Sequence, residues 1–240
     1  MTHFLSRFHV VLGAVAVLLI SVSSFAAPNS PTKKTINVGI YAPFTSDSAY
    51  IGRNILGAME IARGQLNSSE IKYEFYTLDQ QPDHAKAART LQKFIDVHHI
   101  NVLLTEGADN SSVVAPLAKK NNLIHFCLGC TGNLADGQNN FQAQSPNHQR
   151  GAALTKTMKP EFVAQFKEEY FSHPVTEAGY AYDIFHLLNQ SAVIAMKKDA
   201  NFSSQAIANN LLALESSKGL MGTFSLDKKG VSYNKKTLTA

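Results

Sequence analysis

Polar and small side chains gather in three short stretches of this sequence, each directly after an apolar run. The candidates in these stretches are Ser46, Ser48, Asn110, Ser111, Gly129 and Thr131. Hydroxyl and amide groups donate and accept hydrogen bonds, and glycine lets backbone N–H groups approach an anion closely. These residue types suit the binding of a small polar molecule. The sequence has no catalytic serine motif, phosphate-binding loop or dinucleotide-binding glycine pattern, so nothing in it indicates an enzyme.

The first polar stretch lies between a predicted strand and a predicted helix. The strand is a short apolar run that contains Ile36, Val38, Ile40 and Tyr41. The helix carries apolar residues at three- and four-residue spacings, namely Ile51, Ile55, Ala58, Met59 and Ala62. This spacing predicts one apolar face that packs on a sheet. Ser48 is the predicted N-cap, because a serine side chain can accept a hydrogen bond from a free N–H group at a helix start.

The alternation of strand and helix continues along the chain. Further strands are predicted over residues 73–78, 101–105 and 123–126, with helices over 85–95 and from 113 onward. Repeated units of this kind predict an α/β fold with a doubly wound, mostly parallel sheet. Such sheets bind ligands outside the carboxyl ends of their strands. We therefore expect the three polar stretches, including a loop predicted over residues 107–112, to converge at one edge of the sheet.

Cys127 and Cys130 are the only cysteines, and their CxxC spacing allows several interpretations. One is a local disulfide, because Gly129 lets the chain bend and the first 26 residues, described next, predict export to an oxidising compartment. A second is two unpaired thiols on opposite sides of a strand. A third is redox catalysis, although a redox CxxC usually begins a helix and this pair follows a strand. A zinc site would need two further ligands at suitable spacing, which the scattered histidines do not supply.

The first 26 residues have the features of a secretory signal peptide. Arg7 is their only fully charged side chain, an apolar run extends from Val10 to Ile20, and small residues stand at Ser24 and Ala26. We expect cleavage after Ala26, export to the periplasm, and a mature chain of residues 27–240 with no membrane insertion. The net charge of +4 comes from lysine pairs spread along the chain without interleaved aromatic residues, which argues against nucleic-acid binding.

Several stretches resemble the leucine/isoleucine/valine-binding family of type I periplasmic binding proteins. The strand INVGIYAP, the loop FTSDSAYIG and the helix up to Asn67 are similar to that family's amino-terminal signature. The stretches GADNSS and CLGCTGN occupy the positions of the family's ligand-binding turns, with Thr131 as the best single match. The stretch NNFQAQSPNHQRGAALT resembles the crossing into the family's second lobe. Residues 158–230 resemble its return helices and a late strand, and they include Tyr182 and Asp183.

This resemblance implies how a solute would be held. Thr131 would hydrogen-bond the ammonium or carboxylate group of an amino acid-like ligand, and the backbone amides around Gly129 and Ser111 would hold the carboxylate. Tyr50 would cover one side of the solute. The other predicted site residues are Ser46, Ser48 and Asn110. We expect no cofactor and no metal, and the family implies an ABC permease as a partner.

The resemblance also indicates that most of the second lobe is missing, because residues 156–160 lead directly into the return helices. We therefore expect a single lobe built from residues 35–142 and 158–230. One hypothesis is an exported solute-binding protein of an ABC-type importer for amino acids or similar small polar solutes. The alternative is a single-lobe scaffold that binds a protein partner or its own copy and no solute. A second chain that completes the cleft is a further predicted partner, because one lobe cannot close on a ligand.

Overall fold

The computed structural model describes residues 33–66, 70–130, 133–144, 158–214, 217–227 and 230–233. The predicted signal peptide lies outside them and stays a prediction. Among the described residues, no helix combines the length and the apolar composition needed to cross a bilayer.

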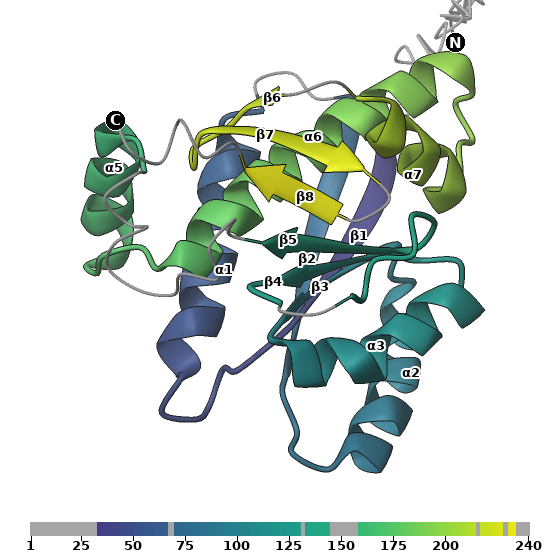
Figure 1. The fold of residues 1–240 in the computed structure, drawn as a ribbon, viewed down its shortest axis with the longest axis horizontal. Helices are drawn as coiled ribbons and strands as arrows, with labels where there is room; N and C mark the ends of the chain where they lie inside the picture. The colour runs from purple at the N-terminus through teal and green to yellow at the C-terminus, as the bar shows by residue number, and fades with distance from the viewer. Residues whose placement is uncertain are drawn as a thin grey trace, which may run out of the picture. The chain divides into compact units, whose positions relative to one another are not determined.

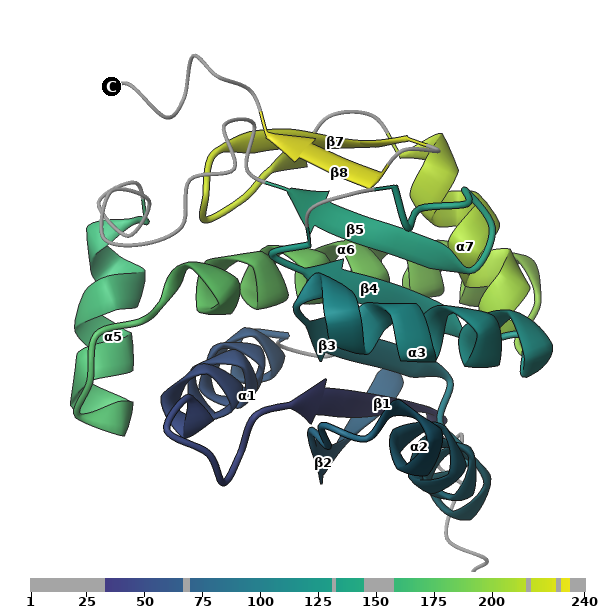
Figure 2. The same ribbon diagram turned by 60° about the horizontal axis from the view of Figure 1, so that its bottom comes forward.

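Eight strands form one sheet in the order β2-β1-β3-β4-β5-β8-β7-β6 (Figures 1 and 2). They are β1 (Lys34–Ala42), β2 (Ile71–Asp79), β3 (Val102–Glu106), β4 (Ile124–Leu128), β5 (Asn140–Gln144), β6 (Ser217–Lys218), β7 (Thr223–Asp227) and β8 (Gly230–Tyr233). The first five strands are mutually parallel, and β8 pairs parallel with β5. Strand β7 runs antiparallel to both of its neighbours, β6 and β8. The predicted mostly parallel α/β sheet is confirmed.

Helices cover both faces of the parallel part of the sheet, as expected for strands joined by right-handed crossovers. They are α1 (Ala49–Gly64), α2 (His84–His98), α3 (Ala108–Lys120), α5 (Pro160–Tyr170), α6 (Thr176–Lys198) and α7 (Ser204–Ala213). Figure 2 shows α2 and α3 together on one side of the sheet, where they form a small apolar cluster. The larger cluster on the opposite side contains residues of α1, α5, α6 and α7.

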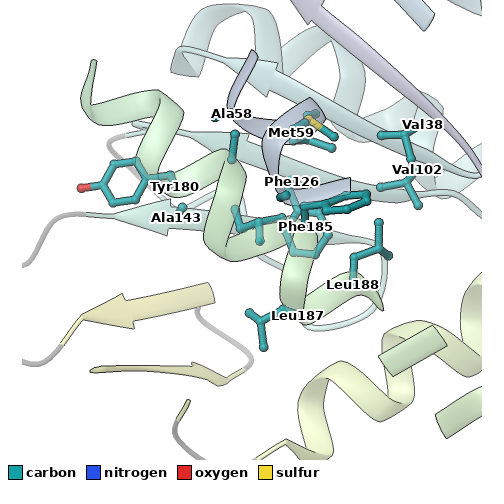
Figure 3. Close-up of a cluster of buried hydrophobic side chains, with 14 of the residues drawn as sticks. Val38, Ala58, Met59, Val102, Phe126, Ala143, Tyr180, Phe185, Leu187 and Leu188 are labelled. Atoms are coloured by element: carbon teal, nitrogen blue, oxygen red, sulfur yellow. The ribbon is translucent and has the colours of Figure 1, made fainter. Parts of the chain in front are cut away.

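The side chains of the central strands divide between these two clusters according to the two-residue period of a strand. In β1, Ile36, Val38 and Ile40 belong to the larger cluster, whereas Tyr41 belongs to the smaller one. Figure 3 shows Val38 and Val102 of the sheet beside Phe185 and Leu188 of α6. The apolar alternation of β1 therefore determines which helices it meets on each face.

The part of the chain after residue 158 packs against the first part rather than on itself. Helix α6 lies along α1, and the Phe185 ring meets the rings of Tyr73 and Phe75 edge-on, with centroids 4.8 and 5.4 Å away. Near the start of α6, the Val175 N–H group donates to Asn54 Oδ1 at 3.0 Å. Residues far apart in the sequence thus share one core, while the predicted lobe boundaries themselves stay a prediction.

Candidate functional site

Three central strands end at one edge of the sheet, where the polar stretches begin. Strand β3 pairs in parallel with both β1 and β4, in a register that aligns Tyr41 with Thr105 and Thr105 with Cys127. The Gly107 N–H group also donates to the Leu128 carbonyl oxygen at 3.2 Å, which joins the ends of β3 and β4. In parallel α/β sheets this carboxyl edge is where ligands bind.

The loop after β1 is held in place by Asp79, the last residue of β2. Its carboxylate accepts hydrogen bonds from the backbone N–H groups of Phe44, at 2.6 Å, and Thr45, at 3.2 Å, and from the Thr45 hydroxyl. Burial by itself would raise the pKa of Asp79, but these donors and the Gln80 N–H group outweigh it and hold the pKa below its usual value. Asp79 is therefore a carboxylate that positions the loop.

The predicted site residues of this first stretch all face solvent. Ser46 and Ser48 are exposed, and the Ser46 Oγ atom accepts a hydrogen bond from the Ser48 N–H group at 3.3 Å. Ser48 is the N-cap of α1, as predicted, although its side chain makes no capping hydrogen bond. The Tyr50 side chain, in the first turn of α1, is 50% exposed. These three side chains are accessible to a ligand at the edge.

The second polar stretch is not the loop that the sequence predicts. Gly107 adopts a φ of +82°, and α3 begins directly after it at Ala108. A glycine tolerates this backbone conformation without strain, so the chain turns from β3 into the helix without intervening residues. Asn110 and Ser111 therefore lie in the first turns of α3. The Asn110 side-chain amide donates to the Glu106 carbonyl oxygen at 3.3 Å.

Ser111 is fully buried and points into the protein. Its N–H group donates to the Gly107 carbonyl oxygen at 3.2 Å, and its hydroxyl forms a hydrogen bond with the Thr105 hydroxyl. Both groups of Ser111 that could hold a carboxylate are thus engaged within the fold. Ser111 is therefore part of the packed interior beneath the edge, and its side chain does not line the surface that a ligand would contact.

A series of hydrogen-bonded, buried polar side chains extends from Ser111 across the strands beneath this edge of the sheet. The Thr105 Oγ1 atom lies 2.8 Å from His125 Nε2, and His125 Nδ1 lies 2.8 Å from Asn140 Oδ1. The Asn140 Nδ2 atom donates to Asp136, so Asn140 Oδ1 is an acceptor and His125 carries its proton on Nδ1. Complete burial lowers the pKa of His125 to about 4. The imidazole is therefore neutral at pH 7 and serves to connect strands β3, β4 and β5.

The third polar stretch begins with a buried disulfide between Cys127 and Cys130, whose Cα atoms are 5.7 Å apart. Between them, Gly129 has a φ of +66°. A Cβ atom at Gly129 would lie 3.4 Å from Glu177 Oε1, so the Glu177 side chain lies directly over this glycine. Thr131, the best match in the sequence, lies outside the described residues, and its role stays a prediction.

Two acidic residues at this edge were not among the predicted site residues. Asp79 directly follows the predicted second strand. The sequence therefore already shows an acidic side chain at the carboxyl end of a strand, which could have indicated a site residue. Glu177 has no such signal. It reaches the edge because α6 begins there, although α6 is far along the chain from all three polar stretches.

Comparison with known proteins shows the fold. No protein-family model matches the chain, and a search of curated proteins finds no match. The leucine-binding protein LivK from Thermotoga maritima aligns with a TM-score of 0.63 at 12% identity, covering 81% of this chain and 92% of its own. The substrate-binding protein LivJ from Streptococcus pneumoniae, solved with isoleucine, gives 0.67 at 13% identity, with coverages of 83% and 94%.

A solute-binding protein of an ABC transporter from Rhodopseudomonas palustris, solved with benzoate, also aligns, with a TM-score of 0.67 at 13% identity. The alignment covers 82% of this chain and 91% of that protein. Similarity at this level of identity establishes a common architecture. The chain has the fold of type I periplasmic binding proteins, and the resemblance read from the sequence is confirmed at the level of the fold.

Proposed function

We propose that this protein is an exported solute-binding protein of an ABC-type importer, and that it binds an amino acid or a similar small polar solute at the carboxyl edge of β1, β3 and β4. The observation that carries the proposal is the meeting of three polar chain segments at this edge, in a fold shared with ABC-transporter substrate-binding proteins. Ligands of parallel α/β sheets bind at this position because loop side chains and helix N-termini converge there.

The residues at the edge match the charges of a free amino acid. Glu177 supplies a carboxylate for the ammonium group, next to the backbone at Gly129. The positive end of the α3 helix dipole, at its N-terminus, favours a carboxylate. Tyr50 is exposed and can cover an apolar side chain. Ser46, Ser48 and Thr131 complete the proposed set as hydroxyl donors and acceptors.

One sheet edge covers less of a solute than the 70–90% that is typical of ligand pockets. Weak affinity is therefore expected for the isolated chain. A second chain that faces this edge, either a permease or another copy of this protein, would increase the buried surface of the solute and strengthen binding.

Calorimetric titration of the mature chain with each of the twenty amino acids tests the proposal. We expect measurable binding of at least one amino acid. Because a hydrogen bond to a charged group contributes roughly 1.5–3 kcal/mol, Glu177→Gln and Thr131→Ala should each weaken binding by about ten- to a hundredfold. Glu70→Gln, at the opposite end of the sheet, is the matched control and should leave the affinity unchanged. Equal affinities in all variants would contradict the proposed site.

Exposed aromatic residues favour a second candidate function, a protein-interaction module. Phe171, the C-cap residue of α5, is 92% exposed, and Tyr50 is 50% exposed. The hydrogen bond from Val175 to Asn54 holds the segment after Phe171 against the first half of α1, the helix that carries Tyr50. Sedimentation velocity over a range of concentrations tests this function. A dimer that Phe171→Asp abolishes, together with no solute binding, would favour the interaction module.

A further inference from the structure

A separate cavity of about 220 Å³ lies between α6, the N-terminus of α5 and the segment that contains β6. Its lining includes Lys159, Asp183, His186, Leu187, Lys218 and Leu220. None of these residues belongs to the polar stretches after β1, β3 and β4. The cavity is therefore distinct from the proposed solute site.

The wall formed by residues 219–221 is fixed to α6 by Asp183. The two carboxylate oxygens of Asp183 accept hydrogen bonds from the N–H groups of Leu220, at 2.5 Å, and Met221, at 3.0 Å. A Cβ atom at Gly219 would lie 2.5 Å from this carboxylate, so only glycine permits such a close approach. The wall is part of the folded core, because Leu220 and Met221 are both buried.

The opposite side of the cavity is equally well anchored. Met158 is buried in the larger apolar cluster, and Lys159 follows it as the N-cap of α5. The Tyr182 ring packs against Phe162 of α5, with centroids 5.1 Å apart, and against His186, at 4.6 Å. The cavity thus has defined walls on both sides before any ligand enters.

The charged side chains of this lining carry more positive than negative charge. Lys159 and Lys218 contribute two positive charges, and the single acidic residue, Asp183, already accepts from two backbone N–H groups. Within the described part of the chain, His186 Nε2 is shielded from solvent and has no hydrogen-bond partner. Leu187 and Leu220 add an apolar surface. A lining of this kind lacks an anionic acceptor that an incoming ligand would supply.

We propose that this cavity binds a small organic monocarboxylate. Its carboxylate pairs with the ammonium groups of Lys159 and Lys218, which are exposed side chains, while its apolar body lies against Leu187 and Leu220, near the His186 ring. The volume is below the 300–1,000 Å³ of pockets for drug-sized ligands, which restricts the site to a compact molecule. The site is independent of the proposed transport function.

Titration of the mature, full-length chain with benzoate, monitored by calorimetry and by the imidazole NMR signals of His186, tests this site. Benzamide, which has nearly the same shape without the charge, and inorganic phosphate, which has charge without an apolar body, are the comparison probes. We expect benzoate to bind and to shift the His186 signals. We expect benzamide and phosphate to bind at least about tenfold more weakly, because each lacks one of the two recognised features.

Matched variants locate the binding. Lys159→Gln and Lys218→Gln should each weaken benzoate binding by about tenfold, whereas Lys197→Gln, an exposed lysine at the end of α6, should not change it. Glu177→Gln, in the proposed amino acid site, should also leave benzoate binding unchanged. Thermal unfolding of each variant verifies that it is folded. Equal affinity for benzamide, preference for phosphate, or unchanged affinity in the Lys159→Gln/Lys218→Gln double variant would overturn the assignment.

Discussion

The two faces of the central sheet are built differently. On the face covered by α1 and α6, the buried side chains of strands β1, β3, β4 and β5 are apolar, such as Val38, Leu104 and Phe126. On the face covered by α2 and α3, the same strands present Leu103 and Tyr41, but also the buried polar residues Thr105, His125 and Asn140. The buried strand side chains of the first face make apolar contacts, whereas those of the second face combine apolar packing with a series of hydrogen bonds.

The two faces also differ in the sequence distance that they bridge. Helices α2 and α3 pack beside strands that directly precede or follow them, whereas α6 packs against α1 and β2, more than a hundred residues earlier. Contacts over such distances form only when the whole chain is folded, because their loop-closure entropy must be offset by many contacts at once. The packing on the face of the sheet that α1 and α6 cover should therefore control the cooperativity of unfolding.

The largest expected effect is the truncation of Phe185, which is 1% exposed on this face. Phe185→Ala removes two aromatic contacts and leaves a cavity, so it should lower the free energy of unfolding by about 3–5 kcal/mol. Urea denaturation followed by circular dichroism measures the change. Val97→Ala is the control, since Val97 is 60% exposed and should change the stability by less than about 0.5 kcal/mol.

Unfolding of the wild type should remain a single transition, because both faces use the same strands. If residues 158–233 unfolded in a separate, earlier transition, the packing of α6 against α1 would not be the feature that unites the two parts of the chain.

The sequence predicts the α1 and β1 part of the fold well, because the apolar spacing of each element is regular. It does not predict that α3 begins at Ala108. The polar residues Asp109, Asn110 and Ser111 are typical of a loop, yet Ser111 is buried because Thr105 offers its hydroxyl a partner. Tertiary hydrogen bonding of this kind has no signature in local sequence, and it is the reason why one predicted site segment became part of a helix.

The second prediction concerns the pH dependence of stability and a residue on the face of the sheet that α2 and α3 cover. Burial lowers the pKa of His125 to about 4, whereas the unfolded chain has a value near 6.5. Between these values the unfolded state binds a proton that the folded state does not, so stability falls as the pH decreases from 6.5 to about 4. The expected loss is about 3 kcal/mol over this interval.

Chemical denaturation at several pH values between 7.5 and 4 measures this dependence. Burial and the nearby Lys159 also lower the pKa of His186, so this histidine contributes in the same direction. The His125→Gln variant isolates the contribution of His125, because its stability should vary less with pH than that of the wild type. A parallel pH dependence in both proteins would show that the buried imidazole is not responsible.

The third prediction compares two glycines. Gly39 lies in β1 beneath α2, and a Cβ atom there would lie 2.7 Å from Phe94 Cε1 and 2.9 Å from Leu103 Cδ2. Gly39→Ala should therefore destabilise the protein by about 1–3 kcal/mol through overpacking. Gly64 ends α1 and has no atom within 4 Å of its added Cβ, so Gly64→Ala should stabilise by about 0.5–1 kcal/mol. An unchanged or higher melting temperature for Gly39→Ala would refute the close packing of α2 on Gly39.

The candidate site is less predictable from sequence than the fold. Ser46, Ser48 and Tyr50 are exposed where local reasoning places them, because they follow one strand and begin one helix. Glu177 belongs to the same edge only through the long-range packing of α6. When a site is built from both parts of the chain, the sequence predicts only those site residues that a local strand or helix pattern places at the edge.

The smallest expected change in global stability comes from Asp79, at the carboxyl edge where both parts of the chain meet. Asp79→Asn removes the charge from the group that accepts hydrogen bonds from Phe44 and Thr45. Unfolding should change by less than about 1 kcal/mol, since the loop is exposed, yet amide hydrogen exchange at Phe44 and Thr45 should accelerate by about tenfold. Hydrogen-exchange NMR measures both residues directly.

Asp83→Asn is the matched control for this variant, because Asp83 accepts a comparable hydrogen bond from the Lys86 N–H group, at 2.9 Å, as the N-cap of α2. Its effect should be confined to the first turn of α2. If the edge binds a solute, the Asp79→Asn variant should also bind it more weakly, because the solute must then order the loop that carries Ser46 and Ser48. The Asp83→Asn variant should bind it unchanged. Faster exchange without weaker binding would mean that the loop after β1 is not part of the solute site, which would leave Gly129 and Glu177 as its remaining walls.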